Sequence, residues 1–364
     1  MQYVFILGHN PKLSVAEILA LLPNAKIIKE TDSFLILEND EINCDDFLNR
    51  LGGTIKIGRV ISDKIDDKLI IETLKQVQGD SKIKFGLSYY DCKLNNLGLE
   101  IKKELKTLGI NSRLVTSKDK ALSSVIVTKN KVNEFLILGN EYLAETCAVQ
   151  DFKGYGKRDF GRPVRDMLSG SMPPKLAKIM INLTQAPKGT TLLDPFCGSG
   201  TLLQEALLLG YKVIGTDLSV KAIKDSKENL AWFEKEFKLN KYKILLSDVI
   251  DLSKNIKSVD AIVTEPYLGP PLKGNETEKK IKDIISELST LYIEAFGEFK
   301  KVLSRDGKIA IVIPAFRVGK EILELPIIEQ IKNMGFIQVN RDKLIYSREG
   351  QKVWRQIYIF KQQF

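Results

Sequence analysis

The sequence is poor in the side chains on which many hydrolases and metalloproteins depend. It contains a single histidine, His9, and four cysteines that lie far apart, without the spacing of metal ligands. Zinc and haem sites are therefore not expected. With one histidine near the start of the chain, Ser-His or Cys-His nucleophilic catalysis is not expected either. The separated cysteines predict a reduced, cytoplasmic protein.

Long apolar runs are also missing. No stretch approaches the roughly 18 apolar residues that a membrane-spanning helix needs, so no membrane partner is expected. The N-terminal MQYVFILGHNPKLS has no basic residue ahead of its apolar run, and it predicts a strand, not a signal peptide. With 44% hydrophobic and 28% charged residues, the 364-residue chain has the composition of a soluble globular protein. Its length favours about two or three domains.

The chain is basic overall, with a formal net charge of +9, and the segment 81–165 is the most basic per residue. A basic balance favours a polyanionic partner such as nucleic acid. Many basic proteins bind no nucleic acid, so charge alone leaves the partner open.

The order of elements predicted for the N-terminal part is that of a small ferredoxin-like unit, β-α-β-β-α-β. Strands are expected at 2–7, 25–28, 33–37 and 54–61, and helices after the Ser14-x-x-Glu17 capping box and at 44–51. Next come a strand at 83–90, a helix at 94–108, and strands at 112–116 and 134–138. The following DFKGYGKRDFGRPVRD, residues 151–166, is rich in glycine without a helical apolar period, which predicts an interdomain linker or a functional loop.

From residue 173 onwards, strands and helices alternate. Strands are expected at 190–193, 212–216, 243–246, 261–264 and 308–313, and helices from Pro173-Pro174 and at 201–209, 219–235, 283–303 and 321–333. Two closing strands are expected at 336–346 and 353–361. This pattern predicts an open parallel α/β sheet with an antiparallel hairpin at one edge.

The turn DPFCGSG, residues 194–200, follows an apolar strand and begins a helix. It therefore lies at the edge where open α/β sheets bind ligands. Gly198 and Gly200 let the backbone turn tightly and approach a ligand closely. The turn is not G-x-G-x-x-G and lacks the lysine of a P-loop, which disfavours a phosphate site.

Two further aspartates, Asp217 and Asp248, follow the next two expected strands. Asp217 can accept hydrogen bonds from ribose hydroxyls, and Asp248 or its neighbouring backbone can accept from an adenine amino group. Each could instead be a helix N-cap. Taken with the glycine turn, these carboxylates suit a ligand with a sugar, a base and a cationic amino-acid tail, which predicts S-adenosylmethionine. Phe196 and Leu218 are expected to line the same site.

The fourth of these strands leads into VTEPYLGPP, residues 263–271. An enzyme that methylates an exocyclic base amine needs acceptors for the amine hydrogens and an aromatic ring that stacks on the extruded base. Proline keeps the preceding carbonyl exposed as an acceptor. No metal is required. The expected catalytic residues are Thr264, Glu265, Pro266 and Tyr267. The segment LGPPLKGN, which begins after Tyr267, is either a mobile lid or a rigid loop.

Over nearly its whole length the chain resembles the THUMP-domain, class I methyltransferases that methylate N2 of guanosine at position ten of tRNA. The resemblance is carried by FILGHNPKLSVAEI, RDFGRPVRDMLSGSMPPKLAKIMINL, DPFCGSGTLLQEA and YSREGQKVWRQIYIF. It implies a Rossmann-like methyltransferase domain, with a seven-stranded sheet and an antiparallel edge hairpin, preceded by ferredoxin-like and THUMP α+β domains. The corresponding parts are a ferredoxin-like domain at 1–75, a THUMP-like RNA-binding domain at 76–150, a basic linker at 151–172 and the methyltransferase domain at 173–364.

For the cofactor, the resemblance implies that Asp194, Gly198 and Gly200 hold the amino-acid end of S-adenosylmethionine. By the same matching, Asp217 holds the ribose and Asp248 the adenine. Cys197 in this turn is expected to be a small packing residue.

The loop after the fourth strand departs from the family. Pro266 and Tyr267 match the end of the family's Asp-Pro-Pro-Tyr, whereas Thr264 and Glu265 replace its aspartate and first proline. Either Glu265 supplies the missing carboxylate from one residue later, or Thr264 and backbone carbonyls suffice.

RNA-binding side chains are expected in the basic middle segment and in the connector: Arg113, Lys118, Lys120, Lys157, Arg158, Arg162 and Arg165. The alternatives are a solvated face for the first group and a salt-bridged linker for the second. The connector also carries Tyr155 and Phe160, which are expected to be an exposed aromatic pair.

The expected function is methyl transfer from S-adenosylmethionine to N2 of a guanosine in tRNA, by a cytoplasmic monomer. Some family members work with a small zinc-binding activator subunit, so such a partner is possible here. One alternative is a DNA or rRNA amino-methyltransferase with the same loop. Another is a catalytically weak or inactive RNA-binding protein that retains the cofactor fold.

Overall fold

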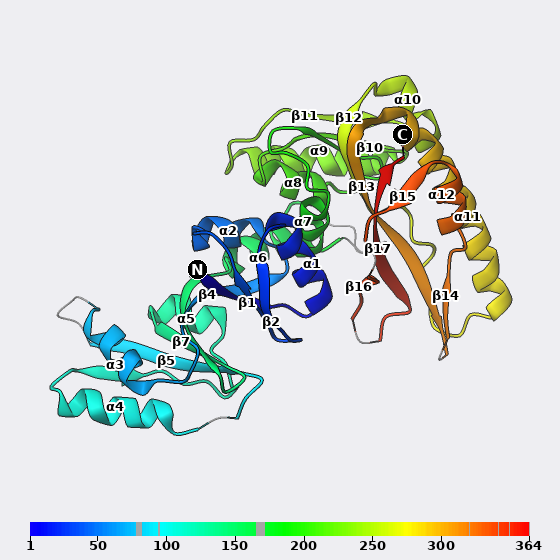
Figure 1. The fold of residues 1–364 in the computed structure, drawn as a ribbon. Coiled ribbons are helices and arrows are strands. Elements are labelled where there is room, and N and C mark those ends of the chain that lie inside the picture. The colour runs from blue at the N-terminus through cyan, green and yellow to red at the C-terminus, as the bar shows by residue number, and fades with distance from the viewer. Residues whose placement is uncertain are drawn as a thin grey trace. The chain divides into compact units, whose positions relative to one another are not determined.

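The structure, a computed structural model, describes residues 1–77, 82–93, 95–164, 172–319, 321–340, 342–348 and 350–363. The chain divides into two compact units (Figure 1). The first comprises Met1–Val15 and Leu22–Gly154, and the second comprises Ala16–Leu21 and Tyr155–Phe364. In the described part, no helix is long and apolar enough to cross a membrane.

The first unit begins with the β-α-β-β-α-β order expected from the sequence. The elements in this order are β1 (Gln2–Leu7), α1 (Pro11–Leu21), β2 (Lys26–Glu30), β3 (Phe34–Glu38), α2 (Cys44–Arg50) and β4 (Thr54–Ser62), and the residues Ala16–Leu21 of α1 are grouped with the second unit. β1 lies between β3 and β4 and is antiparallel to both. This is the arrangement of a ferredoxin-like unit, so the prediction for this region is confirmed.

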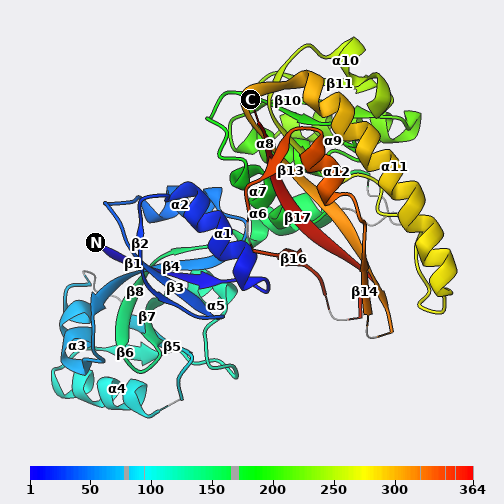
Figure 2. The same ribbon diagram turned by 45° about the vertical axis from the view of Figure 1, so that its right-hand side comes forward.

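The rest of the first unit continues the same sheet. Its elements are α3 (Asp67–Lys75), β5 (Ile83–Tyr90), α4 (Leu97–Thr107), β6 (Ser112–Leu114), α5 (Ser124–Asn130), β7 (Asn133–Leu138) and β8 (Tyr142–Val149). β8 pairs with both β4 and β7, which gives one eight-stranded sheet in the order β2-β3-β1-β4-β8-β7-β5-β6. The helices α3 and α4 lie side by side (Figures 1 and 2). The expected boundary at residue 75 remains a prediction.

The expectation of reduced cysteines is wrong for one pair. Cys44 at the start of α2 and Cys147 in β8 form a disulfide, with their Cα atoms 6.0 Å apart. They are separated by 103 residues, so only the packing of α2 against β8 brings them together. Cys92 and Cys197 are free and buried.

The second unit is an open α/β sheet. Its strands are β9 (Thr191–Asp194), β10 (Lys212–Asp217), β11 (Tyr242–Leu246), β12 (Val259–Thr264), β13 (Leu303–Val318), β14 (Glu321–Glu324), β15 (Phe336–Gln338), β16 (Leu344–Tyr346) and β17 (Val353–Gln362). The main path runs β11-β10-β9-β12-β13-β17-β15, with β17 antiparallel to its neighbours. The predicted parallel sheet with an antiparallel edge is therefore confirmed. The main path has the seven strands expected, and in the described residues β14 and β16 add short pairings to β13 and β17 outside this path.

The helices of the second unit are α7 (Pro174–Leu183), α8 (Thr201–Leu208), α9 (Val220–Glu234), α10 (Leu252–Asn255), α11 (Glu278–Val302) and α12 (Ile328–Asn333). The helix expected at 321–333 is wrong in its first part, where β14 pairs with β13 and Pro326 separates it from α12. The strand expected at 336–346 is divided into β15 and β16. The connector contains α6 (Phe152–Phe160), where a loop was expected.

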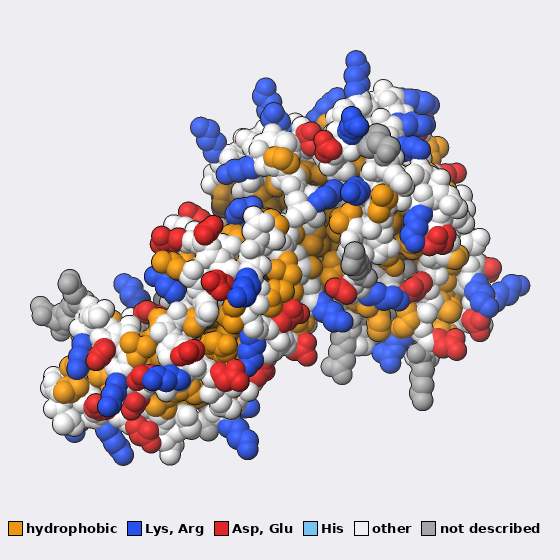
Figure 3. Space-filling view, in the orientation of Figure 1, with side chains coloured by type: hydrophobic (Ala, Val, Ile, Leu, Met, Phe, Trp, Pro, Cys, Tyr) orange, Lys and Arg blue, Asp and Glu red, His pale blue; other side chains and the backbone are white. Residues whose placement is uncertain are grey.

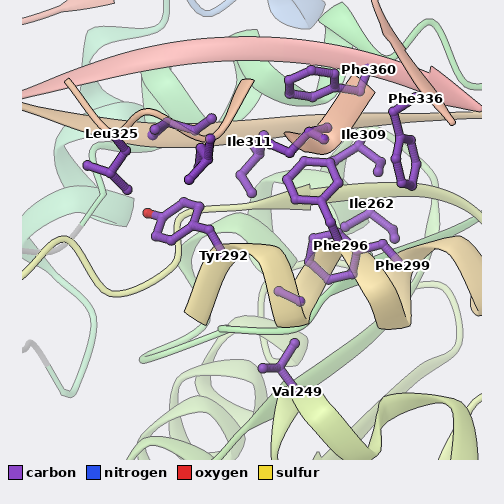
Figure 4. Packing of buried hydrophobic residues seen from close by; sticks show 14 of the residues in the cluster. Val249, Ile262, Tyr292, Phe296, Phe299, Ile309, Ile311, Leu325, Phe336 and Phe360 are labelled. Atoms are coloured by element: carbon purple, nitrogen blue, oxygen red, sulfur yellow. The ribbon is translucent and has the colours of Figure 1, made fainter. Parts of the chain in front are cut away.

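The helix α11 packs its apolar face against the centre of this sheet. Tyr292, Phe296 and Phe299 point from α11 towards residues of the sheet that include Ile311 and Phe360 (Figure 4). The rings of Phe296 and Phe360 meet edge to face, with centroids 5.2 Å apart. This core fixes β12 and β13, whose neighbouring ends carry the candidate site.

Candidate active site

The carboxyl ends of the parallel strands place the predicted site residues along one edge of the sheet. Asp194 ends β9, Asp217 ends β10 and Thr264 ends β12, and β9 pairs with both other strands. Asp248 follows β11, the outer neighbour of β10. The structure therefore brings together residues that the sequence separates widely, at the edge where such sheets bind ligands.

Asp194 is the most buried of these carboxylates, with 3% of its surface exposed. Its Oδ1 accepts hydrogen bonds from the Thr264 hydroxyl at 2.7 Å and from the Phe196 amide at 3.2 Å. Burial raises the pKa of Asp194 to about 7, the two hydrogen bonds lower it, and the nearby carboxylates of Asp217 and Glu265 raise it further. A cation placed beside this carboxyl would favour its ionised form.

The glycine turn is fastened from two sides. The Gly198 amide donates to Asp217 Oδ2 at 3.0 Å, and the Ser226 hydroxyl donates to the Gly198 carbonyl at 2.9 Å. Gly200 has φ +84°, and a Cβ added there would lie 2.8 Å from Ser226 Oγ. At Gly198, with φ +52°, a Cβ would meet nothing within 4 Å. The turn is therefore closed on the side of α9 and open on the other, as a close approach by a ligand requires.

The two outer aspartates differ in whether they cap a helix, and the binding of ribose and adenine by them stays a prediction. Ser219, not Asp217, caps α9, and Asp217 accepts instead from the Gly198 and Ser219 amides. Asp248 caps a 3₁₀ helix, accepting from the Ile250 amide at 3.3 Å. The capping alternative thus holds for Asp248, whose neighbouring backbone remains available to a base.

Apolar side chains are exposed beside these aspartates. Leu218 is 70% exposed and Ile250 is 50% exposed. Large apolar side chains at the edge of the sheet where a ligand binds can pack on the faces of a planar base. Sequence reasoning named Leu218 but missed Ile250, whose only sequence signal is its position just after the strand end and Asp248.

The loop that follows β12 has an ordered, partly buried start. Thr264 is fully buried and its hydroxyl faces Asp194, so it joins the loop to the glycine turn. Pro266 is buried, whereas Tyr267 is 55% exposed. The Tyr292 hydroxyl of α11 donates to the Val312 carbonyl at 3.1 Å and lies 3.5 Å from the Tyr267 carbonyl. The exposed ring of Tyr267 is therefore carried on a backbone anchored to the core.

Glu265 is held by a residue that sequence reasoning missed. Arg355 of β17 donates from Nε and Nη2 to the two carboxylate oxygens of Glu265, the second at 3.1 Å. The Arg355 side chain is 11% exposed and the Glu265 side chain is 14% exposed. The only sequence signal for Arg355 is a charged residue inside an otherwise apolar strand, VWRQIYIF.

The expected RNA-binding residues divide into two groups. Arg113, Lys118 and Lys120 are exposed, as a role in binding RNA requires, and this role stays a prediction. On the face drawn in Figure 3, Lys and Arg side chains are interspersed with Asp and Glu. A mixed surface of this kind does not by itself distinguish RNA contact from solvation.

In the connector, the expectation of phosphate contact is corrected for two arginines. Arg158 is buried and donates to Glu205 at 2.6 Å, and Arg162 is buried and donates to the Thr201 hydroxyl. These bonds tie the connector to α8, in agreement with the salt-bridged alternative. Lys157 is more exposed and pairs with Glu236. Arg165 lies outside the described residues.

The aromatic pair of the connector is also divided. Tyr155 is buried, and the charged ends of Arg158, Lys175 and Lys178 lie 4.6, 5.3 and 4.9 Å from its ring centre. Phe160 is 68% exposed. The expectation of exposure therefore holds for Phe160 and is wrong for Tyr155, which packs inside the second unit.

Among the residues that the structure describes, no cluster of His, Cys, Asp and Glu could hold a metal ion. Cys197 is buried in the glycine turn, and burial raises the pKa of its thiol. A thiol in this state is a weak nucleophile.

The sheet order and the ligand edge define an α/β protein of the methyltransferase class. Residues 162–344 match the family described as RMKL-like, methyltransferase domain. The chain belongs to this methyltransferase family.

Proteins similar to this chain over its full length or part of it are consistent with this assignment. The chain is 28% identical over 379 residues to a tRNA (guanine(10)-N2)-dimethyltransferase of Pyrococcus abyssi, covering 99% of both chains. It is 38% identical over 149 residues, 40% of each chain, to a protein of the same name from Methanothermobacter thermautotrophicus. The crystal structure of TrmN from Thermus thermophilus is similar over 100% of both chains, at 15% identity and a TM-score of 0.54, which supports the fold.

Proposed function

We propose that this protein transfers a methyl group from S-adenosylmethionine to the exocyclic N2 of a guanosine in tRNA, at position ten. One observation carries the proposal: the Thr264 hydroxyl is bonded to Asp194, so the expected base-binding loop and the expected cofactor turn form one site. The full-length relative named for guanine-10 N2 supports the choice of tRNA and of the target atom.

The residues at the sheet edge fit S-adenosylmethionine. The cationic amino-acid end suits Asp194 and the open side of the Gly198 turn. Asp217 suits the ribose, and Leu218 with Ile250 suits the adenine beside Asp248. When bound, the cofactor supplies an electrophilic methyl group.

The loop after β12 suits the target base. The exposed Tyr267 ring can stack on an extruded guanine, a contact worth about 1–3 kcal/mol. The carbonyl before Pro266 can accept a hydrogen bond from the amine. An amine whose lone pair is delocalised into the ring needs such orientation, and placement in line with the methyl group supplies the rest of the rate acceleration.

The proposal assigns tRNA docking to the THUMP-like part of the first unit, where Arg113, Lys118 and Lys120 are exposed. The enzyme would act in the cytoplasm as a monomer. Turnover by the purified chain alone would show that it needs no activator subunit.

A tRNA transcript without modifications tests the proposal. The chain is incubated with labelled S-adenosylmethionine and the transcript, and the nucleosides are separated by mass spectrometry. We expect N2-methylated guanosine, mono- or dimethylated, and its loss when guanine 10 is replaced by adenine. In parallel incubations with DNA or rRNA in place of the transcript, label on DNA adenine or only on rRNA would favour the amino-methyltransferase alternatives. Binding of both tRNA and cofactor without turnover would favour an inactive RNA-binding protein.

A further inference from the structure

The bond between Glu265 and Arg355 crosses the sheet. In the strand order, β13 lies between β12, which leads into Glu265, and β17, which carries Arg355. Arg355 pairs in register with Pro314 of β13, and its guanidinium reaches both oxygens of Glu265. A planar fork on a carboxylate fixes the direction in which the carboxylate faces, which a single bond would not do.

While bound to Arg355, Glu265 still lies at the edge of the sheet that carries the candidate site. It follows Thr264, whose hydroxyl donates to Asp194 at 2.7 Å, so the carboxyls of Glu265 and Asp194 are neighbours, and the charge of Glu265 adds to the effect of burial in raising the pKa of Asp194. Burial tends to lower the pKa of Arg355, but the bonds to Glu265 raise it above its ordinary value. Arg355 therefore stays charged, and the Glu265 carboxylate that it holds is both fixed and partly exposed.

This arrangement has unused capacity to accept hydrogen bonds. Each carboxylate oxygen can accept two hydrogen bonds, and Arg355 supplies one to each. Because the fork takes the two lone pairs that converge, the remaining ones point apart, and one oxygen can meet one donor of a base. The Watson–Crick edge of guanine offers two adjacent donors, N1–H and the N2 amine. Adenine instead places the acceptor N1 beside its amine, and an acceptor facing a carboxylate is repelled.

We propose that Arg355 holds Glu265 as a reader of guanine, in which one carboxylate oxygen accepts from N1–H of the target base through the lone pair that the fork leaves free. The proposal rests on the proposed function and deepens it. Glu265 is then the specificity-determining residue, and Arg355 is the positioning residue that aims it. The loop keeps the proline and tyrosine of the family at Pro266 and Tyr267. The carboxylate lies one residue after the position of the family's aspartate, and Arg355 of β17 holds it.

The test compares two tRNAs that differ only in the target base, guanine or 2-aminopurine. The analogue keeps the N2 amine, but its N1 is an acceptor and it lacks O6. Sites built around a hydrogen bond reject substrates that lack it, so wild-type protein should favour guanine by at least roughly a hundredfold in kcat/KM. In Glu265→Gln the amide can donate to the N1 acceptor, so the preference should fall by at least roughly tenfold. Both proteins lose the same contact to O6 on the analogue. A smaller preference for guanine in Glu265→Gln than in the wild type is therefore expected only if Glu265 contacts N1.

Two variants test the positioning role. Arg355→Met should lower kcat on the guanine tRNA and weaken the preference against 2-aminopurine, while calorimetric cofactor affinity stays unchanged. Arg355→Lys keeps the charge without the fork, so it should restore only part of kcat. The matched control is Glu329→Gln, which removes an exposed ion pair with Lys332 on α12 and should leave both substrates unchanged.

The outcomes separate this inference from the proposed function. Equal rates on both tRNAs by wild-type protein, or the same preference in Glu265→Gln, would overturn the inference and leave the proposed function standing. No methylation of the guanine tRNA by wild-type protein would overturn the proposed function itself. If Arg355→Met does not fold, the comparison of wild type with Glu265→Gln still decides.

Discussion

The buried carboxyl of Asp194 predicts that cofactor binding depends on pH. Its pKa, raised from 3.8 to about 7 by burial, leaves it largely protonated at pH 6. A cationic ligand binds best to the ionised form, so binding below pH 7 must release the proton. At pH 6 only about a tenth of the free protein is ionised, so the affinity for S-adenosylmethionine should be about tenfold lower than at pH 8. Above pH 8 the contribution of Asp194 should be constant.

Calorimetry provides the assay. Titrations at pH 6 in buffers of different ionisation enthalpy report the number of protons released, which should be close to one in the wild type. Asp194→Asn is the matched control: it should bind more weakly at pH 8 and lose the proton release that belongs to this carboxyl. The amino group of the ligand titrates identically with both proteins. The difference in the number of protons released by the wild type and by Asp194→Asn therefore comes from Asp194. Equal affinity of the wild type at pH 6 and pH 8 would refute the reasoning.

The same raised pKa fixes the direction of the pH effect on stability. Between pH 3.8 and about 7 the native state holds a proton that the unfolded chain releases. The contribution of Asp194 to the free energy of unfolding therefore falls as the pH rises through this window, and bound cofactor should oppose the fall.

Three substitutions test other parts of the account. Tyr267→Ala should lower methyl transfer to tRNA at least roughly tenfold, about 1.4 kcal/mol of barrier, with unchanged cofactor affinity; full activity would show that no base stacks there. Gly200→Ala should lower the thermal midpoint, because φ +84° costs an alanine about 1–2 kcal/mol and the Cβ would lie 2.8 Å from Ser226 Oγ; an unchanged midpoint would contradict the tight turn. Phe296→Ala, at 0% exposure, should lower the free energy of unfolding in urea by about 3–5 kcal/mol, and a loss below 1 kcal/mol would show that the core under α11 relaxes.

The strands β9 to β12 of the second unit were predictable because each is a short apolar run that ends in a distinctive turn. DPFCGSG after β9 and Asp217 after β10 indicated both the strand ends and the ligand edge. For α6 a loop was predicted wrongly, because its two glycines are unfavourable in a helix and its apolar residues lack helical spacing. The helix begins beside Asp151, whose side chain accepts from the Gly154 amide at 2.9 Å.

Partners distant in the sequence were beyond prediction. A row of basic residues in the connector predicts positive charge, but it does not reveal that Arg158 meets Glu205 on another helix. The departure at Glu265 was visible in the sequence, but its partner Arg355 lies 90 residues away and is placed only by the sheet order. Composition and spacing report local structure, whereas ion pairs of this kind depend on the tertiary fold.

The central claim is methyl transfer to N2 of a tRNA guanosine, and position-resolved mass spectrometry of the product tests it most directly. After incubation of purified protein, S-adenosylmethionine and unmodified tRNA, digestion into oligonucleotides should place the added methyl mass on guanine 10. Fragmentation should assign it to N2. Methyl mass on another base or another atom, or none with folded and cofactor-bound protein, would contradict the account.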